Sequence, residues 1–121
     1  MKIEKELMRG AGPLAVMKQL SRGEMYGYQL VKALSRQSGG LLEMGQSTLY
    51  PMLYNMEAKG LVASRVENGP NGKPRKYYFL TDAGQKHLVV EESKWQTLMR
   101  AMTALGLGGM PGAAHLEGAL S

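Results

Sequence analysis

The stretch from Ser47 to Gly60 constrains the fold most, because it joins a helical apolar stripe to an unusual outer face. Its large apolar residues recur at i, i+3, i+4 and i+7, so they share one face of an α-helix; they are Leu49, Met52, Leu53 and Met56. The opposite face is hydroxylic and aromatic, with Ser47, Tyr50, Pro51, Tyr54 and Ala58. We therefore expect the apolar stripe to be buried and the outer face to contact a partner.

Local signals also predict where this helix begins and ends. Ser47 or Thr48 can cap its start, and Pro51 should then lie in or beside the first turn, where a missing N–H costs little. Gly60 suits a left-handed termination.

Directly after Gly60 the sequence period changes from 3.6 to 2. Residues 61–66 read as a strand, residues 67–74 are dense in turn formers, and residues 75–80 read as the returning strand. The pattern predicts a β-hairpin whose tip holds Asn71, Gly72 and Lys73. A hairpin that follows a contact helix is typical of the wing of a winged helix.

The positive charge is concentrated around this hairpin. The chain carries a net charge of +5, and residues 59–76 contain five basic residues and one acidic residue, a net +4. A basic segment beside a contact helix is typical of nucleic-acid binding. The alternative is a hairpin whose charges are simply solvated.

Two further helices are predicted before residue 47. Residues 3–20 have helical apolar spacing, interrupted at Gly12-Pro13, where the helix either kinks or restarts. The second runs from about Tyr26 to Gln37, with Lys32 on an exposed side. Tyr26 either contacts phosphate or anchors the helix entry, and Tyr28 is expected to be partly buried. Joined by a short turn to the helix from Ser47, this helix forms a helix-turn-helix pattern.

The last predicted helix covers residues 81–105, with Thr81 as its N-cap. An a/d seam of nearly three heptads follows, with one acid in it: Leu88, Glu91, Trp95, Leu98, Met102 and Leu105. We expect a second copy of the chain to cover this seam, so that it forms a homodimer. The alternative is that the helix packs on its own domain. Residues 106–121 are Gly-rich and aperiodic, and we expect a flexible tail.

Composition and spacing argue against an enzyme. There is no cysteine, so a thiolate metal site is excluded. His87 and His115 lie far apart in the sequence, and we find no clustered metal ligands, no nucleophile with a base and no phosphate loop. We expect no catalytic residue, no metal and no cofactor. The N-terminus lacks a signal peptide and no segment is a membrane span, so we expect a cytoplasmic protein without a membrane partner.

Several motifs in order resemble the PadR family of bacterial transcriptional regulators, in its short subfamily. They are Tyr26–Leu30, Leu49–Pro51, Met56-Glu57 with Gly60-Leu61, Arg75–Tyr78 with Leu80-Thr81 and Gly84, and finally Trp95. The resemblance covers about residues 3–105 and departs from the family pattern at Gly12-Pro13. It implies a winged helix-turn-helix, a two-fold dimer formed by the last helix with help from the first, and repression at a pseudo-palindromic operator. In some relatives a phenolic or drug-like ligand at or near the dimer interface releases the DNA.

These inferences give an α+β, mostly α, winged helix-turn-helix with a long C-terminal dimerisation helix. Residues 1–80 are the predicted DNA-binding domain, 81–105 the dimerisation helix and 106–121 the tail. The major-groove contacts are predicted at Gln46, Ser47, Thr48, Tyr50, Pro51 and Tyr54. The contacts to the DNA backbone, from the second helix and the wing, are predicted at Tyr26, Lys32, Arg65, Asn71, Lys73, Arg75 and Lys76.

Two questions stay open at this point. Trp95, with Met99 beside it, is either an aromatic wall for a small planar effector or a seam residue that packs against its mate. The whole protein is either a sequence-specific DNA-binding repressor or a winged-helix dimer that acts as a protein-interaction module without DNA.

Overall fold

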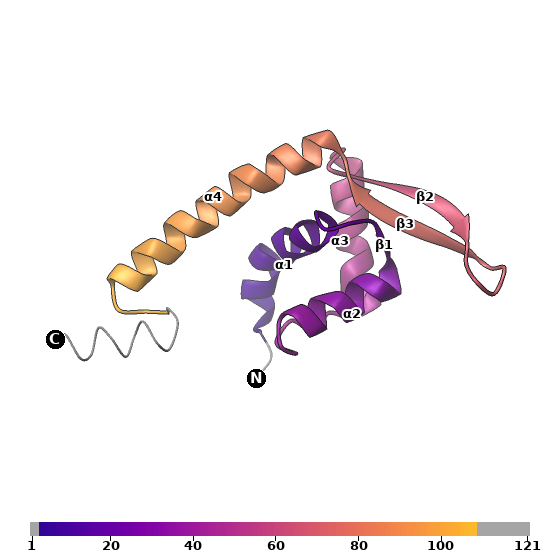
Figure 1. Ribbon diagram of the computed structural model, residues 1–121. Helices are drawn as coiled ribbons and strands as arrows, with labels where there is room; N and C mark the ends of the chain where they lie inside the picture. Colours follow the sequence, from indigo (N-terminus) through magenta and orange to yellow (C-terminus); the bar gives the residue numbers. More distant parts are fainter. Residues whose placement is uncertain (1–2, 109–121) are drawn as a thin grey trace. The chain divides into compact units, whose positions relative to one another are not determined.

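The computed structural model describes residues 3–108 (Figure 1). The chain divides into two compact units, the first ending at Val89 and the second beginning at Val90. Along the chain the elements are α1 (Lys5–Leu20), β1 (Met25–Tyr26), α2 (Gly27–Gln37), α3 (Gln46–Ala58), β2 (Val62–Asn68), β3 (Pro74–Leu80) and α4 (Asp82–Ala104). The fold is therefore α+β and mostly helical, as predicted. Most of the expected tail, residues 109–121, lies outside the described residues.

Helix α1 continues through Pro13 without a second start. The proline removes one backbone hydrogen bond. Val16, Met17 and Leu20 on the following turns are at most 3% exposed and hold the helix in the core. Gly12 is buried against α3: a Cβ at this position would lie 2.7 Å from Cε of Met52. Gly12-Pro13, where the sequence departs from the family pattern, therefore lies where α1 closely approaches α3.

The predicted apolar stripe of α3 is buried. Leu49 and Leu53 are 0% exposed and Met56 is 4% exposed, whereas Met52 is partly buried at the edge of the core. The other helices and the sheet complete this core with Val16, Met17, Leu20, Leu30, Leu34, Met44, Val62, Tyr78, Leu80 and Leu88.

The predicted start of α3 was wrong, and its predicted end is confirmed. The N-cap is Gly45 in extended conformation, with no side-chain cap, so neither Ser47 nor Thr48 caps the helix. Pro51 consequently lies in the second turn rather than the first. Gly60 has φ +75°, and the next N–H, from Leu61, donates to the carbonyl of Met56 at 2.9 Å, which closes the helix.

Strands β2 and β3 form the predicted hairpin, which projects from the helices α1–α3 (Figure 1). The turn is closed by the N–H of Gly69, which donates to the carbonyl of Lys73 at 2.7 Å, and Gly72 at the tip has φ +79°. A third strand, the two-residue β1, pairs with β3 and gives the antiparallel order β1-β3-β2. Strand β1 was not predicted from the sequence, because two residues are too few to show a period.

The start of α4 is fixed to the rest of the domain. The Thr81 hydroxyl accepts the N–H of Gly84 at 3.0 Å, as expected of an N-cap, and donates to the carbonyl of Gly60 at 2.6 Å. Leu88, which we expected in the dimer seam, is 5% exposed and belongs to the core of its own chain. The first compact unit therefore extends into α4, as far as Val89.

We predict that Gly84→Ala destabilises the protein by about 2 kcal/mol or more. A Cβ at Gly84 would collide with the backbone carbonyl group of Leu61, whose carbon would lie 2.9 Å away, and backbone cannot move aside as a side chain can. Urea denaturation followed by circular dichroism, at one protein concentration, measures the change.

Gly10→Ala is the matched control, since Gly10 also lies in a helix but has nothing within 4 Å of an added Cβ. This variant should gain about 0.5–1 kcal/mol from helix propensity. Equal effects of the two substitutions would contradict the close packing at Gly84.

Candidate nucleic-acid interface

The outer face of α3 is open to solvent over most of its length. Gln46, Ser47, Thr48 and Pro51 are exposed and Tyr54 is 54% exposed. Tyr50 is half-buried, and its ring stacks on that of Tyr54 with centroids 6.0 Å apart. This face is uncharged, so it offers hydrogen-bonding and aromatic groups rather than electrostatic attraction.

Tyr50 also joins α3 to the start of α2. Its hydroxyl occupies the space that a side chain at Gly27 would fill, and Gly27 itself is buried. The phenol thus reaches the first turn of α2, and any side chain at position 27 would displace it. Packing against Gly27 therefore constrains Tyr50, although this residue also belongs to the outer face of α3.

Tyr26 and Tyr28, on either side of Gly27, have different surroundings. Tyr26 is partly buried, with its ring edge-on to Tyr77 at 5.6 Å and under the guanidinium of Arg75 at 4.4 Å. Tyr28 is 52% exposed, so the expectation that it is partly buried at the helix entry was wrong. It precedes the buried Leu30 by two residues, or about 200° around the helix, which turns it toward solvent.

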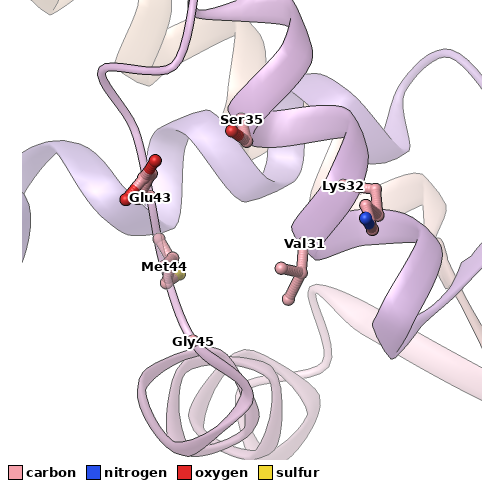
Figure 2. Close-up of a pocket in the computed structure, with 6 residues that line it drawn as sticks. All are labelled: Val31, Lys32, Ser35, Glu43, Met44 and Gly45. Atoms are coloured by element: carbon pink, nitrogen blue, oxygen red, sulfur yellow. The ribbon is translucent and has the colours of Figure 1, made fainter.

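A hollow of about 410 Å³ lies between α2 and the segment that leads into α3 (Figure 2). Val31, Lys32 and Ser35 line it from α2, and Glu43, Met44 and Gly45 line it from the connecting segment. The hollow therefore lies beside the first turn of α3, which no side chain caps. Lys32 on its rim also lies 5.4 Å from the ring centroid of Tyr28.

The basic residues of the hairpin are divided between its two faces and its tip. The Nζ of Lys76 lies 5.7 Å from the ring centroid of Tyr54 and 3.9 Å from a carboxylate oxygen of Glu57, so Lys76 faces α3. Arg75 lies on the other face with Tyr26. Lys73 and Asn71 are exposed at the tip, where the Asn71 side chain accepts the N–H of Lys73 at 3.2 Å. The structure thus brings Lys76 to the outer face of α3.

Arg65, also predicted to contact phosphate, has two carboxylate partners. Its Nε donates to Glu24 at 2.9 Å and its Nη2 to the other oxygen of the same carboxylate, while Nη1 lies 3.0 Å from Glu67. The hydrogen bond from Arg65 lowers the pKa of Glu24, and the same pairing raises the pKa of Arg65. Glu24 was not predicted as a partner of Arg65, because 41 positions separate the two residues and neither periodicity nor local charge links them.

Two kinds of feature are absent from the described part of the chain. Among residues 3–108, no three side chains of the types His, Cys, Asp and Glu are placed to hold a metal ion. Within the same range, none of the helices is both long enough and apolar enough to cross a membrane.

Comparisons with known proteins converge on one family. Residues 16–90 match the model of the transcriptional regulator PadR-like family. A transcriptional regulator of Mycobacterium tuberculosis is 30% identical over 96 residues, covering 79% of this chain and 86% of that protein. A PadR family regulator from Eggerthella lenta has a solved structure that is 40% identical, with a TM-score of 0.72 over 83% of this chain and 85% of that one.

A second solved structure supports the fold alone. The PadR-like regulator of Bacillus cereus is 24% identical and superposes with a TM-score of 0.75 over 87% of this chain and 100% of its own.

The junction of α3 with the hairpin leads to a prediction about pH. Burial, chiefly, raises the pKa of Tyr78 from 10.0 to about 12, and the nearby Tyr54, Glu57 and Tyr50 add to the effect. The unfolded chain therefore loses this proton at a lower pH than the folded chain. The free energy of unfolding should be unaffected below about pH 10 and should fall as the pH rises toward about 12.

Urea midpoints from about pH 8 to pH 12, compared between the native protein and Tyr78→Phe, isolate the contribution of the Tyr78 hydroxyl. The native protein should lose more stability over this interval than the variant. Parallel pH profiles would contradict the shift.

Proposed function

Since this chain belongs to the PadR-like family of transcriptional regulators, as its motifs predicted, we propose that it represses transcription by binding a pseudo-palindromic operator as a homodimer. Regulators of this family bind DNA and are not enzymes. The observation that carries the proposal is the exposed outer face of α3, which is uncharged and has the basic hairpin beside it. We also propose that the protein acts in the cytoplasm, where its DNA would be.

In this proposal the first turns of α3 enter the major groove. Gln46, Ser47 and Thr48 are exposed and carry donors and acceptors that suit base edges. Pro51 and Tyr54 continue the same exposed face. Tyr50 contributes the accessible part of its ring, while its hydroxyl end holds α3 against α2.

The contacts to the DNA backbone come from three places. Lys73, Asn71 and Arg75 of the hairpin would reach sugar and phosphate on one side of the groove, and Lys76 would do so beside Tyr54. Lys32 would contact phosphate from the rim of the hollow in Figure 2. Tyr26 would take part through Arg75, which covers its ring. These contacts supply affinity and orientation, whereas α3 supplies selectivity.

The second half of α4, with Leu105 directly after it, is the proposed dimer surface. Leu98, Met102 and Leu105 are 45%, 39% and 75% exposed, and Glu91 and Trp95 are partly buried. Apolar side chains at heptad spacing on an uncovered helix favour pairing with a second copy. Because Leu88 is buried in the core of its own chain, the paired seam would begin at Glu91.

We assign Trp95 to this seam rather than to an effector site. The alternative, in which Trp95 and the 60% exposed Met99 bind a planar aromatic effector, is tested by titrating such compounds while following Trp95 fluorescence. A saturable change that also releases DNA would overturn the assignment.

The DNA-binding proposal predicts different effects for Lys76→Ala and Thr48→Ala. Loss of a phosphate contact should weaken binding to all sequences and reduce the slope of log affinity against log salt by about 0.9. Thr48→Ala should instead change the ranking of operator variants while leaving that slope unchanged. Binding isotherms at several salt concentrations, with DNA from the promoter of its own gene, measure both.

Lys86→Ala, which removes an exposed lysine of α4 outside the predicted interface, is the control for total charge. An unchanged slope in Lys76→Ala would refute its role. The absence of a specific complex at moderate salt would favour the interaction module over the repressor.

The dimer proposal predicts that Leu98→Glu produces a monomer in sedimentation equilibrium, because it places a charge in the apolar seam. Operator affinity should fall by about 100-fold, since the two half-sites would no longer be bound by one linked particle. Gln96→Glu, an exposed position off the seam on the same helix, should remain a dimer. A dimeric Leu98→Glu protein would place the interface elsewhere.

A further inference from the structure

Each of the three nitrogen atoms of the Arg65 guanidinium meets a carboxylate of the same chain. Its Nε and Nη2 hold the two oxygens of Glu24, and its Nη1 holds Glu67 at 3.0 Å. Isolated ion pairs at a protein surface contribute little, but bidentate geometry and membership of a network are the conditions under which they do contribute. Arg65 and Glu24 meet both conditions.

This network also joins strands that share no backbone hydrogen bonds. In the sheet order β1-β3-β2, Arg65 lies on β2 and Glu24 directly precedes β1, so their pairing spans β3. Beneath it the register aligns Tyr26, Tyr77 and Arg65 in one row across the three strands. The Arg65 guanidinium lies 5.1 Å from the Tyr77 ring centroid, and the Tyr77 ring meets Tyr26 edge-on.

This row of side chains connects the hairpin to the helices of the predicted DNA-binding surface. Strand β1 has only two residues, paired with β3 through Met25 and Tyr26. It leads directly into α2 at Gly27, and α2 packs on α3 through Tyr50. A two-stranded hairpin alone is marginally stable. The buried side chains of Val62, Tyr78 and Leu80 hold the base of the hairpin in the core. The pair of Arg65 and Glu24 adds a link between the hairpin and the start of α2.

The local charge argues against a phosphate as the partner of Arg65. With Glu24 and Glu67 on either side, the three side chains carry a net negative charge. A phosphate would have to displace a bidentate carboxylate and then lie close to both acids. Lys73 at the tip is exposed and forms no ion pair among those that the structure shows in the described residues, so it is better placed for that role.

We propose that Arg65 is a positioning residue that braces the hairpin against the start of α2 through Glu24, and that it keeps this partner when DNA is bound. This inference rests on the DNA binding proposed above and gives Arg65 a different role from the phosphate contact that the sequence predicted. Glu24, which lies outside the predicted interface, becomes a residue on which operator affinity depends.

The decisive experiment compares Glu24→Gln with Glu67→Gln in operator binding across a range of salt concentrations. Both substitutions remove one negative charge beside Arg65, but only Glu24 joins the hairpin to β1. If Arg65 braces the hairpin through Glu24, the Glu24→Gln protein should bind the operator about threefold more weakly than the Glu67→Gln protein. The slope of log affinity against log salt should be unchanged. A phosphate contact predicts the opposite, because loss of the competing carboxylate would free Arg65 and tighten binding.

Exchanging the charges of Arg65 and Glu24 tests whether the link between them can be restored. Arg65→Glu alone should bind more weakly, and Arg65→Glu combined with Glu24→Arg should recover most of the loss, because the link is restored in the opposite sense. If Arg65 contacted phosphate, the glutamate at position 65 would still repel DNA in the double variant. Failure of the rescue would therefore overturn the brace.

Amide hydrogen exchange without DNA separates this inference from the proposed function. The N–H groups of β1 and β3 should exchange faster in Glu24→Gln and Arg65→Gln than in Glu67→Gln. Faster exchange in a protein that does not bind its operator would uphold the brace and refute the DNA proposal. Identical exchange in all three variants would refute the brace, whatever the DNA result.

Discussion

Burial of one side of α3 is the interaction on which the rest of the structure depends. Leu49, Leu53 and Met56 are almost completely removed from water, and each such side chain contributes about 1.5–3 kcal/mol of transfer free energy. Because this side fixes the rotation of the helix about its axis, it decides which residues face outward. The exposed hydroxyl, amide and aromatic groups can be presented in one orientation only because the apolar side cannot turn away from the core.

The basic residues around α3 illustrate how one sign of charge can serve two purposes. Lys76 faces α3 and Lys73 stands at an exposed tip, where each can meet a polyanion. Arg65 instead pairs with the carboxylates of Glu24 and Glu67. The net charge of the segment therefore overstates the number of cations available to a ligand, and the side chains' neighbours, not their count, distinguish the two groups.

Much of the fold could be predicted from local sequence, because each major element has its own period and its own stop. The buried stripe of α3, the termination at Gly60, the hairpin and the Thr81 cap all depend on residues within one element or its neighbour. Long-range features could not be predicted. The two-residue β1 has no period, and the Glu24–Arg65 pair joins distant positions. Gly45 became the N-cap of α3 although Ser47 is the better capping residue. In that case the packing of α3 outweighed the local preference.

The contact between Tyr50 and Gly27 has a consequence for anyone who wishes to retarget this protein. Position 50 lies on the surface that a protein engineer would randomise to obtain a new operator preference, yet its hydroxyl fills the place of a missing side chain at position 27. A combinatorial library that varies both freely would contain many clashing or loosely packed members. Diversity is better placed at Gln46, Ser47, Thr48 and Tyr54, while Tyr50 and Gly27 are kept or exchanged only as a pair. Natural relatives under the same constraint should show the two positions changing together.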